Sequence, residues 1–285
     1  EQSLTSDTLG SRSTAIGAGA LATQNFTTAT NTYNTAVGYY AGVNVTTGET
    51  NTFLGATAGA ANTSGNNNSA MGYAALYTNI LSDRNVAVGN NALYTHNQAT
   101  SVDSYNTAVG FNAGSAVQTG KENTLIGGLA GDAITTGSYN TLLGKETGSY
   151  TVNLTTGGDN VLIGAYSHTS AGSTTRAMVL GYNVQGTTDY TTIGYGANDI
   201  RAAHGNTTWA TVSDERYKKD IVDSTAGLSF INALQPRTFK YKTLGELPET
   251  FTAYEADSTE VFKNSNTNHG FIAQEVKAAI DADSS

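Results

Sequence analysis

The chain has 285 residues, enough for one large domain or two ordinary ones. Only 38% of them are hydrophobic and 13% are charged, while 32 are glycine, a mixture typical either of disorder or of a repeat architecture. The absence of cysteine excludes disulfides and thiolate metal sites, and the net charge of −9 argues against a general nucleic-acid-binding surface. The sequence contains no run of 18 apolar residues and no signal-peptide pattern.

Residues 1–12 precede the first repeat, and we interpret them as a connector to an upstream part. From residue 13 to about residue 197 the chain repeats the motif N-[TSV]-x-φ-G-x-x-A, where φ is a large aliphatic residue. Six of the ten spacings between the motif glycines equal that from Gly38 to Gly55, while three of the others are longer and one is shorter. From Asn34 to Asn160 an asparagine stands four residues before each glycine. The motif glycines are Gly17, Gly38, Gly55, Gly72, Gly89, Gly110, Gly127, Gly144, Gly164, Gly181 and Gly194.

This period predicts a mainly β fold in which short strands stack as the coils of a β-solenoid or β-roll, with about 17 residues per coil. Residues two apart on a strand share a face, so the aliphatic residue and the Thr or Val before it are expected on one side. The glycine permits a bend or a close contact with the next coil, and the asparagine can bond neighbouring backbone or adopt a left-handed turn. At ~4.8 Å per layer, eleven coils predict a rod roughly 50 Å long.

Two rows of small residues run along the predicted rod. Alanine occupies the third motif position in several coils, such as Ala36 and Ala70, and recurs at the eighth position, as in Ala41. We interpret these rows as a smooth outer surface that is buried only against other copies, which predicts a homotrimer. The alternative is a monomeric solenoid with a dry interior. Leucine at the third position in later coils, such as Leu125 and Leu142, predicts a wider or more buried contact there.

The longer spacings fit insertions in turns, such as residues 81–84 and the run from Gln98 to Asp103. Because the motif positions are committed to packing, we expect the variable turns 81–84 and 97–104 to bind a partner. Tyrosines are frequent at or near the predicted turns and suit recognition of a sugar or a protein, although packing between coils explains many of them.

The pattern changes near Arg201. Eight of the 14 basic residues and both prolines follow Ser213, which predicts a second, small α+β domain over residues 213–285 after a linker at 201–212. Residues 225–235 and 271–280 are expected to be amphipathic helices, and residues 238–242 a short strand.

Two resemblances follow from these motifs. The repeats of residues 13–197 resemble the heads of trimeric autotransporter adhesins and the tandem repeats of marine phage fibres. Three segments occur in the order found in the intramolecular chaperone, auto-processing domain of phage tailspikes and endosialidases, and together they resemble it: residues 213–221 (SDERYKKDI), 233–241 (ALQPRTFKY) and 269–276 (HGFIAQEV).

The second resemblance implies that this domain drives trimerisation and then cuts the chain once before Ser213, at the Val212–Ser213 bond. Ser213 is then the nucleophile and Lys218 the base. A neutral lysine can activate a serine hydroxyl, provided that burial or cationic neighbours lower its pKa. The alternative is that Ser213 only caps a helix. Members of that family continue into long helices, so we expect the sequence to be truncated at its C-terminus.

Other candidate sites are weaker. The four histidines are scattered without ligand spacing, so no metal and no cofactor are predicted. Neighbouring coils could bring together two carboxylates, such as Glu122 and Glu146, as a glycosidase requires, but we favour the reading that these are solvated charges in turns.

The favoured function is that of a phage tail fibre, part of the virion and made in the host cytoplasm. It would attach to a host-surface glycan or protein, with other tail proteins upstream and no membrane span. The alternatives are a glycan depolymerase with a site between protomers and a cellular trimeric adhesin, of which the processing motif favours the viral protein over the adhesin.

Overall fold

The computed structural model describes residues 2–205, 210–211, 228–251 and 253–283. The chain divides into two compact units, the solenoid unit (Glu1–Ser213) and the C-terminal unit (Asp214–Ser285). The domain boundary predicted at Ser213 falls outside the described residues.

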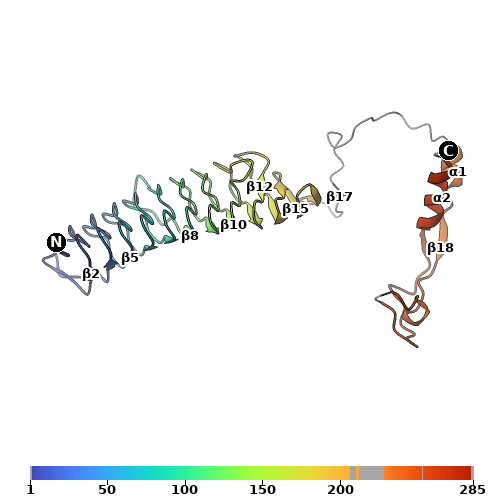
Figure 1. The fold of residues 1–285 in the computed structure, drawn as a ribbon, viewed down its shortest axis with the longest axis horizontal. Helices are drawn as coiled ribbons and strands as arrows, with labels where there is room; N and C mark the ends of the chain where they lie inside the picture. Colours follow the sequence, from blue (N-terminus) through green and yellow to red (C-terminus); the bar gives the residue numbers. More distant parts are fainter. Residues whose placement is uncertain (1, 206–209, 212–227, 252, 284–285) are drawn as a thin grey trace. The chain divides into compact units, whose positions relative to one another are not determined.

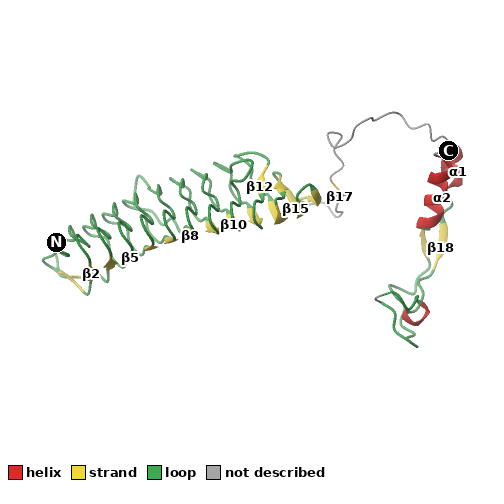
Figure 2. Ribbon diagram, in the orientation of Figure 1, coloured by secondary structure: helices red, strands yellow, loops and turns green. Residues whose placement is uncertain are grey.

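The solenoid unit stacks one short strand per coil into a thirteen-stranded sheet that follows the length of the unit (Figures 1 and 2). Neighbouring strands are parallel and pair motif position to motif position, for example Thr35 with Thr52 and Val37 with Leu54. The predicted β-solenoid, with the coil length expected from the glycine spacing, is therefore confirmed. The strands from β2 to β15 are β2 (Thr14–Ile16), β4 (Thr35–Val37), β5 (Thr52–Leu54), β6 (Ser69–Met71), β7 (Val86–Val88), β8 (Thr107–Val109), β9 (Thr124–Ile126), β10 (Thr141–Leu143), β11 (Val161–Ile163), β13 (Met178–Tyr182) and β15 (Tyr190–Tyr195).

The last strands of this sheet reverse direction. Strand β16 (Asn198–Ala203) pairs antiparallel with β15, and β17 (Ala210–Thr211) pairs antiparallel with β16. Two small parallel pairs lie outside the main sheet: β1 (Gly10–Ser11) with β3 (Thr30–Asn31), and β12 (His168–Thr169) with β14 (Gln185–Gly186).

The interior of each coil is narrow and is filled by the small residues of the motif. Ala36 at the third position and Ala41 at the eighth have no exposed surface, and the larger Phe53 and Leu125 at the third position are equally buried. The interpretation of the two alanine rows as an outer surface is therefore wrong, as is the wider outer contact predicted for the leucines. The middle residue of each three-residue strand faces inward because successive side chains alternate across the sheet.

The motif glycines form a column in which backbones touch. Gly55 has φ of +135°, and a Cβ added to it would lie 2.5 Å from the carbonyl oxygen of Gly72 in the next coil. The same contact recurs between Gly38 and Gly55. The predicted close contact at the glycine is thus confirmed, and it combines a left-handed φ with a space that excludes any side chain.

The motif asparagines form a buried ladder along the solenoid unit. The amide N–H of Asn123 donates to Oδ1 of Asn106 at 3.0 Å, and that of Asn140 donates to Oδ1 of Asn123 at 3.1 Å. The Nδ2 of Asn123 donates to the carbonyl of Gly137, which ties the turn to the strand. Backbone bonding by the asparagines is confirmed, whereas the left-handed conformation belongs to the residue before each of them, such as Tyr105.

The C-terminal unit contains the predicted kinds of element with shifted ends. Helix α1 spans Leu228–Ala233 and helix α2 spans Ala273–Asp283. Between them lie β18 (Arg237–Phe239), the 3-10 helix η2 (Leu244–Glu246) and β19 (Asn268–Gly270).

Candidate functional site

The predicted cleavage residues Val212, Ser213 and Lys218 lie outside the described residues. The roles of Ser213 as nucleophile and Lys218 as base therefore stay a prediction. The described chain ends before them at Thr211 of β17 and resumes after them at Leu228 of α1.

The two downstream motifs of the C-terminal unit come together. Strands β18 and β19 pair antiparallel, with Thr238 opposite His269. Arg237 donates two hydrogen bonds, both 2.9 Å long, from Nε and Nη2 to the two carboxylate oxygens of Glu275 on α2. This ion pair lowers the pKa of the Glu275 carboxyl and raises that of Arg237. Because both groups are exposed, the pair fixes the orientation of the elements more than it stabilises them.

Beside this ion pair is an open apolar groove of about 360 Å³. It is lined by Ala233 of α1, Ala278 and Ala279 of α2 and the stems of Arg237 and Glu275. Ala279 is the one hydrophobic residue of the C-terminal unit that is buried among the described residues. The exposed large hydrophobic residues of the described C-terminal unit are Ile231, Phe251, Phe262, Phe271, Ile272 and Ile280.

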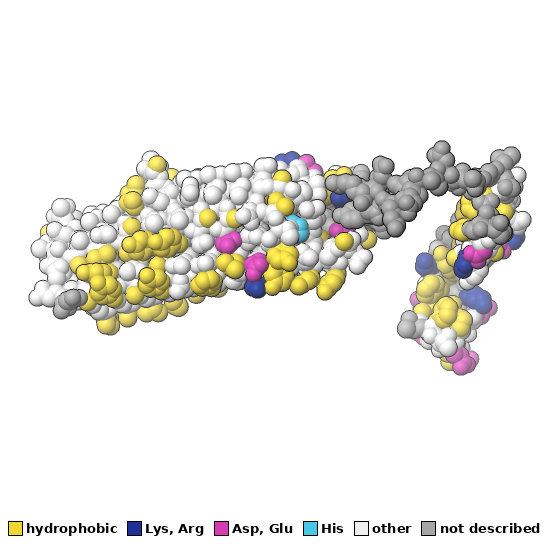
Figure 3. All heavy atoms as spheres, turned by 45° about the horizontal axis from the view of Figure 1, so that its top comes forward, with side chains coloured by type: hydrophobic (Ala, Val, Ile, Leu, Met, Phe, Trp, Pro, Cys, Tyr) yellow, Lys and Arg dark blue, Asp and Glu magenta, His cyan; other side chains and the backbone are white. Residues whose placement is uncertain are grey.

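The outward face of the solenoid sheet also carries apolar side chains. The aliphatic residue of each motif shares this face with the Thr or Val two positions before it, as predicted, and Leu54, Leu143 and Leu180 are each 40% or more exposed. We call this row, the residue before each motif glycine from Ile16 to Ile193, the aliphatic column. Apolar side chains gather along the lower edge of the solenoid unit in Figure 3.

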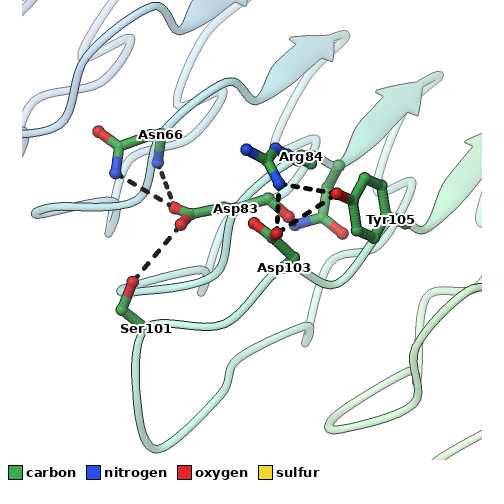
Figure 4. A network of polar contacts seen from close by, with 7 residues as sticks. Asn66, Asp83, Arg84, Ser101, Asp103 and Tyr105 are labelled. Atoms are coloured by element: carbon green, nitrogen blue, oxygen red, sulfur yellow. Dashed lines mark hydrogen bonds and ion pairs between the residues drawn. The ribbon is translucent and has the colours of Figure 1, made fainter.

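The two turns expected to bind a partner lie against each other in adjacent coils (Figure 4). Asp83 and Asp103 form a parallel β-bridge, and the Ser104 amide donates to the Asp83 carbonyl at 3.0 Å. Only the second turn is an insertion, because Gly72 and Gly89, on either side of residues 81–84, have the ordinary spacing of the repeat.

A polar network fixes the side chains of these turns. Asp83 accepts hydrogen bonds from the amide N–H of Asn66 at 2.6 Å and from Ser101 Oγ at 3.4 Å. Arg84 forms an ion pair with Asp103 and donates from Nη1 to Tyr105 Oη at 2.7 Å. The hydrogen bond to Tyr105, followed by the charge of Asp103, raises the pKa of Arg84. The result is an exposed tyrosine ring held beside a guanidinium by several bonds.

The carboxylate pair Glu122 and Glu146 is not brought together, because Glu122 lies five residues before a motif glycine and Glu146 two residues after one. Glu146 forms an ion pair with Lys145 at 3.1 Å and lies near Asp132. Burial, with a smaller contribution from Glu146, raises the pKa of the Asp132 carboxyl.

The burial of His96 was not predicted from the sequence. This side chain has no exposed surface, and neither ring nitrogen has a hydrogen-bond partner. Burial lowers its pKa to about 4, against a smaller opposing effect of the Gln118 backbone. Its place in the repeat, seven residues after Gly89, is the position of Val117 and Ile134 in the next two coils, a signal that was available in the sequence.

Within the described part of the chain, no group of three or more His, Asp or Glu side chains is arranged to hold a metal ion. Nor do the described residues include a helix with the length and apolar character needed to cross a bilayer.

Comparison with known proteins gave one match. Residues 213–283 match the family model described as chaperone of endosialidase. No curated protein and no solved structure matches the chain. The match covers the three C-terminal motifs and begins at Ser213, the residue before which the sequence analysis places the cut. The C-terminal part of the chain is therefore similar to the chaperone of endosialidase, and such a domain behind a β-solenoid fits a tail fibre with a C-terminal chaperone.

Proposed function

We propose that this chain is the distal part of a homotrimeric phage tail fibre that attaches the virion to the host surface. Its C-terminal domain promotes trimerisation and then cuts the chain before Ser213. The observation that carries this proposal is the succession of a long β-solenoid and a chaperone-of-endosialidase match that starts at Ser213.

The C-terminal unit supports the assembly role. A single C-terminal unit leaves six large hydrophobic side chains exposed and, among its described hydrophobic residues, buries only Ala279, so it gains little stability by itself. Contact with the same unit of two other copies would cover these side chains and the groove beside Arg237. The unit is therefore suited to hold three chains together while their solenoids form.

The aliphatic column supports trimerisation of the solenoid. Side chains such as Leu54 and Leu143 recur once per coil on the outward face, so the apolar surface extends over the length of the sheet. An exposed apolar surface this long is typical of an interface between subunits. The aliphatic column, rather than the two alanine rows, is therefore the surface that we propose to be buried between copies.

The cleavage step follows from the chemistry of the first motif. Lys218 removes the proton of the Ser213 hydroxyl, and the oxygen attacks the carbonyl of Val212. The bond between Val212 and the Ser213 nitrogen breaks as the protonated Lys218 returns the proton to that nitrogen, which becomes a free amine while an ester still joins Val212 to the Ser213 oxygen. Water then hydrolyses this ester, which leaves a carboxylate on Val212, restores the Ser213 hydroxyl and releases the fragment that starts at Ser213. A serine–lysine pair of this kind requires that Lys218 be neutral.

The test is the native and intact mass of the full chain beside three variants. We expect the wild type to give a trimer and a fragment that starts at Ser213, at a rate independent of protein concentration once the trimer has formed. Ser213→Ala and Lys218→Ala should leave the chain uncut and trimeric, and Lys218→Arg should also fail, because arginine cannot supply a neutral base. The rate in the wild type should rise with pH as Lys218 loses its proton.

A wild type that is monomeric at micromolar concentration would contradict the assembly role. Equal, uncut masses for the wild type and Ser213→Ala would leave the C-terminal unit as a folding clamp without peptidase activity. Attachment is tested separately, by sedimentation of the labelled trimer with bacterial cells.

A further inference from the structure

One row of residues on the solenoid unit has a left-handed backbone conformation that burial of the side chains does not explain. It consists of the residue five positions before each motif glycine, and we call it the corner row. All its members have φ between 48° and 63°, in the left-handed region, and all but the last are exposed. They are Arg12, Tyr33, Thr50, Asn67, Arg84, Tyr105, Glu122, Tyr139, Asp159, Arg176 and Asp189.

A left-handed φ costs about 1–2 kcal/mol for a residue other than glycine, asparagine or aspartate. Leu21 and Leu93 also have left-handed φ, but their side chains are fully buried, so packing offsets that cost. In the corner row, Tyr33 and Tyr139 are 50% and 55% exposed. Asparagine and aspartate, which tolerate this conformation best, occupy only a minority of the positions in the row. The exposed aromatic rings are therefore retained for something other than folding stability.

The row also positions its rings. Arg12 donates from Nη1 to Tyr33 Oη at 2.7 Å, and its guanidinium lies 5.4 Å from the ring centre. Arg84 repeats the arrangement with Tyr105, at 2.7 Å and 5.5 Å. Two such pairs, four coils apart, hold flat apolar faces in fixed orientations with hydrogen-bonding groups at their edges.

The spacing of the row fits an extended chain. Consecutive members lie one coil apart, roughly 4.8 Å. The amide of Asn67 donates to the carbonyl of Glu49 and that of Arg84 donates to the carbonyl of Asn66, so the backbone here is already paired. An extended peptide binds by pairing with free backbone at a sheet edge, which this row does not offer. A glycan needs no such pairing, because aromatic faces and polar side chains bind it.

The charges of the row select among glycans. Arg84 is paired with Asp103, and Arg176 forms two hydrogen bonds to Asp189. The third arginine, Arg12, is bonded to Tyr33. With Glu122 and Asp159 the basic and acidic side chains of the row balance, and the whole chain carries −9. The row therefore offers no net positive charge to attract a polyanion, whereas its Asn, Asp and Glu side chains can accept hydrogen bonds from the hydroxyls of an uncharged sugar.

We propose that the corner row is the receptor-binding surface of this fibre, and that it binds an extended, uncharged, hydroxyl-rich glycan. Tyr33, Tyr105 and Tyr139 stack on sugar rings, while Asn67, Glu122 and Asp159 bond the hydroxyls. This inference rests on the proposed attachment function and names its ligand class.

The test is retention of the full-length trimer on a panel of immobilised polysaccharides: mannan, dextran and galactan as uncharged chains, and alginate and heparin as polyanions. The variant combines Tyr33→Asn, Tyr105→Asn and Tyr139→Asn. Asparagine suits a left-handed φ better than tyrosine, so the melting temperature should stay equal or rise while the rings are lost. The control is Tyr94→Ala, which removes a tyrosine of the same solenoid that stacks on Tyr77 at 5.2 Å.

We expect at least one uncharged polysaccharide to retain the wild type, and the triple variant to bind it about tenfold more weakly or worse. Tyr94→Ala should bind as the wild type does. Equal binding by the triple variant, retention on polyanions alone, release of shortened chains, or no retention on any uncharged polysaccharide would each overturn the proposal. If the wild type binds a polysaccharide through the corner row but does not sediment with bacterial cells, the proposed attachment function is wrong while the glycan-binding surface is supported.

Discussion

His96 is an ionisable side chain placed where the neighbouring coils carry Val117 and Ile134. Burial lowers its pKa to about 4, below the ordinary value of 6.5 that it regains on unfolding. Between these two pKa values His96 is protonated in the unfolded chain but neutral in the folded chain. The free energy of unfolding therefore falls as the pH drops from 6.5 towards 4. The whole difference between the two pKa values corresponds to about 3 kcal/mol.

We expect His96→Val to remove this pH dependence. At neutral pH the variant should also be more stable, by about 1–3 kcal/mol, because two buried ring nitrogens without partners are removed. The measurement is the urea-induced unfolding of both proteins at pH 7.5, 6.0 and 5.0. The gap between them should widen as the pH falls, and a constant gap would show that His96 is protonated or partnered in the folded chain.

At the scale of the element, each coil is held against the next by the asparagine ladder on one side of the strand and the glycine column on the other. The ladder satisfies buried amides, and the column lets adjacent backbones touch. The column recurs from Gly17 to Gly194 and the ladder from Asn34 to Asn160, because parallel strands in register place equal motif positions next to each other.

Gly55→Ala tests the column. The backbone conformation alone should cost at least about 1–3 kcal/mol, and the overlap with the Gly72 carbonyl adds to it. Gly128→Ala is the matched control, since a Cβ there meets nothing within 4 Å. It should change stability by less than about 0.5 kcal/mol. Thermal melting of the two variants decides the point, and equal losses would mean that the column does not set the spacing of the coils.

At the scale of the whole molecule, the proposed contact between copies accounts for the exposed apolar surfaces of both units. The aliphatic column runs along the sheet, and the C-terminal unit leaves its large hydrophobic residues exposed. In a trimer these side chains would leave water, and burial of apolar surface is the main driving force of association.

Leu143→Lys, a change on the outward face of β10, should therefore weaken the proposed trimer without unfolding the coil, because this side chain is already 43% exposed. The control is Thr119→Lys, at an exposed turn position. Analytical ultracentrifugation should show dissociation at low micromolar concentration for the first variant only. A fully trimeric Leu143→Lys protein would place the contact on another face.

The sequence by itself determined the period, the stacking of one coil per repeat, the close contact at the glycines and the bonding by the asparagines. It also determined the C-terminal domain, because three motifs in order are specific. These features depend on spacing and on positions that only one residue type can occupy. Gly55 is an example, because its φ is left-handed and the carbonyl oxygen of Gly72 leaves no room for a side chain. The cleavage pair Ser213 and Lys218 remains a prediction from the same source.

Only the tertiary structure decided which side of the strand faces inward. Both sides carry apolar residues, alanine on one and Val, Ile or Leu on the other, so alternation defined two faces without assigning them. The side chains at the third and eighth positions, together with buried residues such as Val117 and Ile134, fill the inside of the coil, which leaves Leu54 and its equivalents outside. The same winding places Tyr105 beside Arg84, 21 residues earlier, in an exposed left-handed corner that no local pattern marked. The surfaces proposed for assembly and for the receptor thus both depend on how the chain winds, because winding alone sets which side chains meet water.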